Sequence, residues 1–411
     1  MFDVIVIGGG AAGLTAAISI KQSRPCFNVL ILEKLSRVGK KLATTGNGRC
    51  NITNKNIELS RYHGADTNFA GYALEKYNSK YCQDFFEFLG VPFIFEEDKA
   101  YPQSLQAASV VDALRFECDR LGVKTETEAE VTDIQSKSGV FSVISKEKQY
   151  VAKTVLVATG LLSGGEKLGC DGKMANAIAK KGITLKPTFP GIVQLKTDTT
   201  YTKSLKGIKV NAKACLFVNN KAVREETGEV LFCDYGLSGP PILQLSRTAN
   251  ANAKEKCVIS LDLVKSTGFP DLQKQLLARK EALSYRNNDE FFTGLLNKRL
   301  GQTVLKSCGI ALSESVKSLS ETDIEKICKT LKGFKFNVIG STGFVNSQVT
   351  AGGLATNDFD SKTFACKKLK GLFAAGEILD IDGDCGGFNL QWAWSSAFAA
   401  ANGIIEYLEE K

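Results

Sequence analysis

The chain has 411 residues, of which 44% are hydrophobic and 23% charged, with 38 Gly and 8 Pro. These values are typical of a soluble globular protein of two or three domains, and they exclude a disordered or collagen-like chain. No apolar run approaches the roughly 18 residues that a membrane-spanning helix needs. The start of the chain, residues 1–7, is typical of a buried strand rather than of a signal peptide.

Twelve cysteines lie between Cys26 and Cys385, and none of them forms a C-x-x-C pair. This spacing favours neither a zinc site nor a redox dithiol, so we expect no metal. Reduced thiols without a secretion signal predict a cytoplasmic protein. The only histidine, His63, lies in a polar stretch and is expected at the surface. With so few groups that titrate near neutral pH, a cofactor is the expected carrier of the chemistry.

The net charge of +8 has an uneven distribution. Residues 201–335 contain 22 Lys and Arg against 14 Asp and Glu, so this block carries the whole excess of positive charge. Two interpretations remain open, a solvated basic face or a surface that attracts phosphate.

The first 35 residues predict a strand at 3–7, a glycine turn, a helix over 14–20 and a second strand at 28–33, which together form a βαβ unit. Further along the chain, the pattern predicts helices near 70–89 and 107–121 and strands near 123–134, 139–144 and 150–158. Short strands over 191–262 then indicate a small β domain, and residues 268–332 are helical, polar and basic.

The strongest motif is Gly8-x-Gly10-x-x-Gly13, with Glu33 at the end of the second strand. Strand, glycine turn, helix and distal acid together predict a dinucleotide site. The helix N-terminus offers free N–H groups to the pyrophosphate, and Glu33 is expected to accept hydrogen bonds from the ribose hydroxyls. An acid at this position disfavours the 2′-phosphate of NADP.

The C-terminal region favours FAD over NAD. Residues 373–377 form a strand that ends in Gly376 and Glu377, and a second acid after a strand suits the ribityl hydroxyls, which NAD lacks. The turn 386–389 then opens a long amphipathic helix, whose N–H groups could face the flavin. The alternative is an ordinary helix with Asn389 as its N-cap.

The glycine-rich segment 39–54 is predicted to be a functional loop. We predict Arg49 and Cys50 as catalytic residues: Arg49 could hold an anionic or carbonyl group, and Cys50 could donate a proton. A buried, inert Cys50 is the alternative. Lys40 and Lys41 are expected to contact cofactor phosphates or solvent. The acids at 380, 382 and 384 are expected to form a polar turn before the last helix (Asp380, Asp382 and Asp384). The alternative is a functional charged cluster beside the flavin motif.

Several segments carry a resemblance to one family. They include Gly39-Lys-Lys-Leu42, Gly46-Asn-Gly-Arg-Cys-Asn51, Val349-Thr-Ala-Gly-Gly353 and the stretch from Gly376 to Trp394. Together with the N-terminal motif, these segments resemble the bacterial FAD-binding flavoproteins of the aminoacetone oxidase family, which include the 3-dehydro-bile-acid reductases. One segment departs from the family pattern: residues 161–166 stand where another glycine and a Ser-Tyr-Pro sequence usually follow Thr159-Gly160.

The resemblance implies an α/β fold with a glutathione-reductase-like FAD-binding Rossmann domain, an inserted β domain and a small helical domain. The expected boundaries are 1–190 and 338–411 for the FAD domain, 191–264 and 333–337 for the β domain, and 265–332 for the helical domain. The motifs and the resemblance together predict these cofactor-binding residues: Gly8, Gly10, Ala11, Ala12, Gly13, Glu33, Lys34, Lys40, Gly46, Val131, Ala158, Thr159, Gly160, Gly376, Glu377, Gly387, Asn389 and Leu390.

There is no second G-x-G-x-x-G, so NADH or NADPH is expected to dock only transiently as an electron donor. Three hypotheses of function follow. The first is a flavin-dependent reductase of an activated C=C bond in a small molecule. The second is an enzyme that reduces uridine in ribosomal RNA, which the basic block 201–335 would bind. The third is a non-catalytic, flavin-containing RNA-binding protein. No membrane partner is expected, and the oligomeric state is left open.

Overall fold

The computed structural model describes residues 1–410 and divides into two compact units. The first comprises Met1–Pro190 and the residues from Phe344 onward, and the second comprises Gly191–Gly343. Within residues 1–410, no helix is both long and apolar enough to cross a bilayer.

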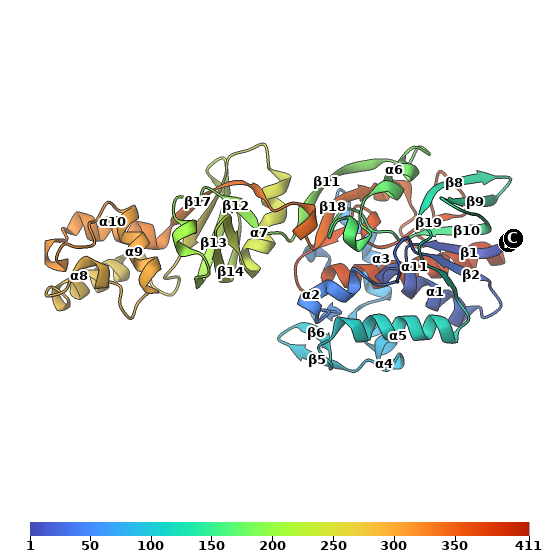
Figure 1. The fold of residues 1–411 in the computed structure, drawn as a ribbon, viewed down its shortest axis with the longest axis horizontal. Coiled ribbons are helices and arrows are strands. Elements are labelled where there is room, and N and C mark those ends of the chain that lie inside the picture. Colours follow the sequence, from blue (N-terminus) through green and yellow to red (C-terminus); the bar gives the residue numbers. More distant parts are fainter. Residues whose placement is uncertain (411) are drawn as a thin grey trace. The chain divides into compact units, whose positions relative to one another are not determined.

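The first unit is built on a seven-stranded sheet (Figure 1). Its strands are β1 (Phe2–Ile7), β2 (Val29–Leu32), β7 (Lys124–Glu126), β8 (Val131–Lys137), β9 (Val140–Ser145), β10 (Gln149–Val157) and β19 (Leu372–Ala374). The order is β7-β2-β1-β10-β9-β8, with β19 paired to β10. β7, β2, β1, β10 and β19 run parallel, whereas β9 and β8 are antiparallel. β2 is wholly apolar and β1 is apolar and buried from Val4 to Ile7, because both faces of a parallel sheet are covered.

Two helices from opposite ends of the chain pack against each other in this unit: α1 (Ala11–Ser23) and α11 (Phe388–Glu409). Both carry small residues at buried positions, among them Ala16, Ala17, Ala400 and Ala401, which permit a close approach. The other helices are α2 (Thr45–Gly48), α3 (Gly71–Lys76), α4 (Ser79–Phe88), α5 (Ala107–Arg120) and α6 (Lys173–Ala179). The helix expected over 70–89 is divided, because Asn78 caps α4 by accepting a hydrogen bond from Tyr81 N.

Three small sheets complete the first unit. β3 (Thr53–Asn54) pairs with β6 (Lys99–Pro102), which pairs with β5 (Phe93–Glu96). β20 (Asp382–Gly383) pairs with β4 (Tyr62–His63), and β11 (Leu185–Gly191) pairs with β18 (Val349–Leu354). The segment 39–63 is thereby tied to the hairpin β5–β6 and to the loop that precedes α11.

The second unit contains a closed barrel with the strand order β12-β15-β14-β13-β16-β17. Its strands are β12 (Leu195–Thr197), β13 (Lys209–Val218), β14 (Lys221–Cys233), β15 (Gly236–Ser238), β16 (Cys257–Asp262) and β17 (Phe334–Ser341). The helices are α7 (Pro240–Ala251), α8 (Phe269–Ala282), α9 (Lys298–Ser307) and α10 (Glu321–Lys332). Because Ser341 on β17 pairs with Leu195 on β12, the last barrel strand extends beyond residue 337, where we expected the β domain to end. The division into three domains stays a prediction.

The close packing of Thr363 against position 403 explains why α11 contains a glycine in its interior. A Cβ atom at this position would lie 2.3 Å from Thr363 O and 2.7 Å from Thr363 Cβ. We expect Gly403→Ala to lower the free energy of unfolding by about 1–3 kcal/mol through overpacking. Urea denaturation measures this change. Gly71→Ala is the matched control, since no atom lies within 4 Å of its Cβ position; equal losses in the two variants would contradict the explanation.

Candidate functional site

The glycine turn after β1 forms an open cradle at the N-terminus of α1. Gly8 has φ +102°, and a Cβ atom on Gly13 would lie 1.9 Å from Gly8 O, so both positions require glycine. A Cβ atom on Gly10 would meet nothing within 4 Å. The helix has neither a side-chain cap nor an acid in its first turn, so its first N–H groups remain available for an anionic ligand.

A cavity adjoins this cradle. It is lined by Gly8, Glu33, Lys34, Val131, Thr159 and Gly160, together with residues of β2 and of the segment 169–174. Glu33 is 9% exposed; its Oε2 accepts a hydrogen bond from Gly9 N (2.9 Å) and its Oε1 accepts one from Leu35 N (2.9 Å). Lys34 pairs with Asp171 on the rim, with Nζ and Oδ2 2.9 Å apart. The predicted acid of the dinucleotide motif is therefore fixed across the glycine turn and borders the cavity.

The C-terminal segment returns to the same cradle. β19 continues the sheet beside β10, and the next residues bring Gly376 to α1, where its Cβ position is 3.0 Å from Ala12 Cβ. Trp392 Nε1 donates to Gly376 O (3.2 Å), and Gly376 N donates to Ser396 Oγ (2.9 Å). The structure thus brings the two predicted halves of the cofactor site together from opposite ends of the chain.

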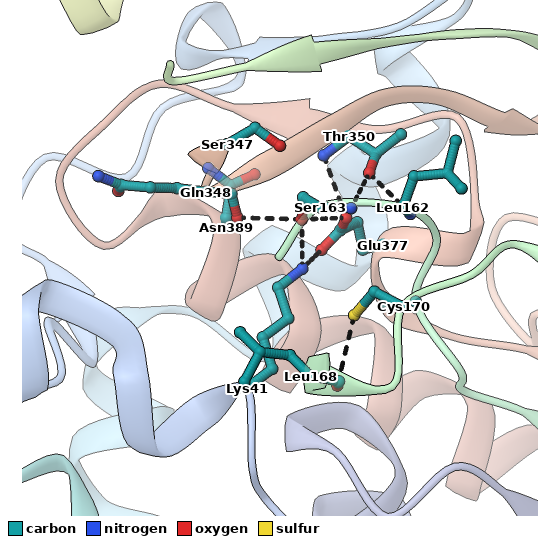
Figure 2. Close-up of polar contacts among 12 residues, drawn as sticks. Lys41, Leu162, Ser163, Leu168, Cys170, Ser347, Gln348, Thr350, Glu377 and Asn389 are labelled. Carbon is teal, nitrogen blue, oxygen red and sulfur yellow. Dashed lines mark hydrogen bonds and ion pairs between the residues drawn. The ribbon is translucent and has the colours of Figure 1, made fainter. Parts of the chain in front are cut away.

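Glu377 lies in a dense polar cluster, shown in Figure 2. Its Oε2 pairs with Lys41 Nζ at 2.5 Å, and its Oε1 accepts hydrogen bonds from Ser163 Oγ (2.9 Å) and Thr350 N (3.0 Å). Lys41 Nζ also donates to Ser163 Oγ (2.5 Å), while Thr350 Oγ1 accepts from the N–H groups of Leu162 (3.1 Å) and Ser163 (2.9 Å). This carboxylate accepts three donors and thereby anchors the loops around it. Its contact with the ribityl hydroxyls stays a prediction.

The charge state of the cluster follows from its geometry. Burial alone would lower the pKa of Lys41, but the Glu377 carboxylate outweighs this effect and raises the pKa above the ordinary lysine value. Lys41 is therefore a cation at neutral pH and neutralises Glu377. The sequence predicted Glu377 as a cofactor-binding residue and Lys41 as a contact either to cofactor phosphates or to solvent. It gave no signal for Ser163, which lies in the segment that departs from the family pattern.

The N-terminus of α11 lies against the glycine-rich loop. Its N-cap is Gly387, without a side-chain cap, and the first turn carries no acid. A Cβ atom on Gly387 would lie 2.6 Å from Thr53 O and 2.8 Å from Asn51 Oδ1, a buried atom that has no hydrogen-bond partner among residues 1–410. Asn389 is not the cap: its side chain binds Gly383 N and Gly383 O at 2.8 Å each. These bonds hold the loop before the helix.

The acids of that loop correct a prediction. Asp380, Asp382 and Asp384 were expected in a polar turn, but they are only 5%, 1% and 6% exposed. Pairing of β20 with β4 encloses them, and Asp384 binds His63 Nε2 at 2.9 Å and Arg61 at 3.3 Å. His63 is correspondingly half-buried, with a side chain 24% exposed, and is not a free surface residue.

The two predicted catalytic residues have different surroundings. Arg49 is paired with Glu96, and its guanidinium carbon lies 4.3 Å from the centroid of the Tyr101 ring. Cys50 is completely buried, and burial raises the pKa of its thiol to about 12. A catalytic role for either residue stays a prediction, and the burial of Cys50 favours the inert alternative.

The remaining predicted residues lie along the same region. Ala11 and Ala12 open α1, Ala158 follows β10, Gly387 and Leu390 flank the start of α11, and Lys40 and Gly46 belong to the glycine-rich loop. The sequence did not identify Ser163, Thr350 and Tyr101. Thr350 lies in one of the segments that resemble the family, but no spacing singled out any of the three side chains, and only tertiary structure brings them to the site.

The sheet, the glycine turn with its distal acid and the returning C-terminal segment define a Rossmann-type dinucleotide-binding protein. The chain belongs to the HI0933-like Rossmann-domain family, which matches residues 2–403. It is 32% identical over 403 residues to a 3-dehydro-bile acid delta(4,6)-reductase of Clostridium scindens and 29% identical over 412 residues to a ribosomal RNA dihydrouridine synthase of Escherichia coli, with 98% of each chain covered in both comparisons. Among solved structures, a quinol-fumarate reductase shares the fold, with a TM-score of 0.52, 15% identity, and coverage of 98% of this chain and 71% of that chain.

These matches confirm the resemblance to the FAD-binding flavoprotein family, the Rossmann-type α/β fold and the oxidoreductase class. Both curated relatives align over nearly their full length, so the inserted segments of this chain also have counterparts in them.

The polar cluster predicts a specific loss of stability. Glu377→Gln leaves the Lys41 ammonium without its counter-charge, so we expect the cofactor-free protein to lose about 1–3 kcal/mol in urea denaturation. The double variant Lys41→Met/Glu377→Gln removes the unpaired cation and should recover part of this loss. Asp84→Asn, which breaks an exposed pair with Lys80, is the control, with a loss of about 0.5 kcal/mol or less. A loss for Glu377→Gln as small as the control would contradict the role of the cluster.

The burial of Cys50 predicts that its thiol resists alkylation. The thiolate is the reactive form, so a pKa near 12 lowers the reactive fraction about a thousandfold at about pH 8 relative to an ordinary thiol. Iodoacetamide labelling followed by peptide mass spectrometry should modify the exposed Cys26 and leave Cys50 intact until urea unfolds the chain. Equal labelling of both residues in the native protein would contradict this expectation.

Proposed function

We propose that the protein binds FAD and reduces a carbon–carbon double bond that is conjugated to a carbonyl group. The meeting of Gly376 with Ala12 carries this proposal, because it joins the pyrophosphate cradle of α1 to the segment that leads into α11. The cavity beside Glu33 fits the adenosine end, and the uncapped N-terminus of α11 fits the flavin end. Bound FAD would supply the hydride, with NADH or NADPH as the proposed electron donor.

The names of the two curated relatives support this substrate class. A 3-dehydro bile acid with delta(4,6) double bonds is a 3-oxo steroid whose alkenes are conjugated with the carbonyl group. Dihydrouridine forms when the 5,6 double bond of uridine, also conjugated with a ring carbonyl, is saturated. The shared chemistry is hydride addition to an electron-poor alkene carbon, which places negative charge on the carbonyl oxygen.

Arg49 is the residue that we assign to this carbonyl oxygen. Its ion pair with Glu96 and its contact with the Tyr101 ring hold the guanidinium against the hairpin β5–β6. A fixed cation at this place would bind the carbonyl group and stabilise the enolate that hydride addition creates. Cys50, completely buried, would keep the loop in place without reacting.

A small-molecule enone is the favoured substrate, and uridine in ribosomal RNA is the second candidate. The basic block 201–335 and the dihydrouridine synthase relatives favour the second, whereas the higher identity to the steroid reductase favours the first. The test is to load the protein with FAD, reduce it anaerobically with NADH or NADPH, and mix it with 3-oxo-4-ene steroids or with a uridine-containing RNA. Reoxidation of the flavin by either one, with formation of the saturated product, identifies the substrate class; a protein that takes up no FAD, or that turns over neither, contradicts the proposal.

The Arg49 assignment predicts a kinetic defect. We expect Arg49→Met to lower kcat/KM by about 10²–10³-fold, the usual loss when a donor to a developing oxyanion is removed. FAD affinity, measured by quenching of flavin fluorescence, should change little. Arg115→Met on α5, whose side chain pairs with Asp112 and Asp119 outside the site, is the control and should retain wild-type kinetics. Equal kcat/KM values for the two variants would remove Arg49 from the mechanism.

A further inference from the structure

The hairpin strand β6 is held against the turn that precedes α11. β6 pairs with β3, with Asn54 opposite Lys99, and Asn54 Nδ2 donates a hydrogen bond to Gly386 O (2.8 Å). Lys99 and Tyr101 are two residues apart on β6, so their side chains project from the same face of the strand. Lys99 Cε lies 3.7 Å from the Cβ position of Gly386, which shows that this face is turned toward the start of α11.

Tyr101 also lies near the turn that precedes α11. The Cys385 thiol interacts electrostatically with both Lys99 and Tyr101. The loop 46–51 covers the ring: the Cβ position of Gly46 is 3.9 Å from Tyr101 Cε1, and the Arg49 guanidinium lies over the ring face. Tyr101 therefore stands between the predicted catalytic loop and the helix end that we assign to the flavin.

The Tyr101 hydroxyl is free to act on a ligand. The residue is 8% exposed, and within residues 1–410 no group hydrogen-bonds to its hydroxyl. Burial raises the pKa of Tyr101, and the Arg49 cation offsets this only in part, with Glu96, Glu97 and Cys385 as the other charged or titratable groups around it. The phenol is thus protonated at neutral pH and has a proton to give.

We propose that Tyr101 is the general acid that completes the reduction, an inference that rests on the proposed function. Reduced FAD, when bound, would supply a hydride to the β-carbon of the conjugated alkene, and the alkene electron pair would move onto the carbonyl oxygen to form an enolate. The enolate then takes the Tyr101 proton at its α-carbon, as the phenol O–H bond breaks and the C–H bond forms. The substrate gains two electrons and two hydrogens, and the phenolate regains a proton from solvent.

Arg49 assists this step in a second way. A guanidinium 4.3 Å from the ring centroid stabilises negative charge on the phenolate that proton transfer leaves behind. Glu96 on β5 holds the guanidinium in this place. The hairpin β5–β6 therefore provides both the proposed acid, Tyr101, and the partner of Arg49, and the glycine-rich loop provides Arg49 itself.

Stopped-flow oxidation of the reduced holoenzyme tests the proposal. With the enone or uridine substrate that the wild type uses, we expect Tyr101→Phe to slow flavin reoxidation by at least about a hundredfold, the usual contribution of a general acid. With ferricyanide, which takes electrons without needing a proton on carbon, the rate should stay within about twofold of wild type. The wild-type rate with substrate should also fall at alkaline pH as Tyr101 ionises, and the variant should lack this alkaline decline.

Tyr81→Phe on α4 is the matched control, since it makes the same change on a ring that is 44% exposed and outside the site. Reoxidation of Tyr101→Phe by the substrate at the wild-type rate would overturn the proposal. An equal slowing with the substrate and with ferricyanide would overturn it too, because it would indicate a structural role for Tyr101. If wild-type enzyme is reoxidised by ferricyanide but by no enone or uridine substrate, the proposed function itself fails, and the role of Tyr101 in it fails too.

Discussion

The close approach of Gly376 to Ala12 is the constraint on which the first unit depends. β19 must enter the sheet beside β10 for Gly376 to reach the N-terminus of α1, and a side chain at 376 would meet the Ala12 methyl at 3.0 Å. Once this contact is made, the positions of Glu377 and of the start of α11 are largely determined. The predicted cofactor site is therefore a product of tertiary closure between segments more than 360 residues apart.

Buried acids then fix the loops that lead away from this contact. Glu377 is neutralised by Lys41, and Asp384 is bound by Arg61 and His63. An unpaired charge at either position would be costly, because burial removes its hydration. Each of these contacts therefore joins a loop from the first 65 residues to the C-terminal segment. Each buried carboxylate needs a basic partner, and in both cases that loop provides it.

Local patterns predicted the frame well and the polar contacts poorly. The apolar runs of β1, β2 and β10 and the glycine spacing before α1 are local signals, and the structure contains each element where it was expected. The acids at 380, 382 and 384 resembled a polar turn because sequence cannot show the pairing of β20 with β4 that buries them. The contact of Lys41 with Glu377 spans 336 residues, and no periodicity reports on such a distance.

The segment that departs from the family pattern, residues 161–166, is anchored largely through its backbone. Leu162 and Ser163 donate their backbone N–H groups to Thr350 Oγ1, and Thr350 donates its own backbone N–H group to Glu377. Backbone donors are present whatever side chains the segment carries, so its sequence can change while the carboxylate keeps most of its partners. Ser163 adds a side-chain anchor, because its hydroxyl binds Lys41 and Glu377.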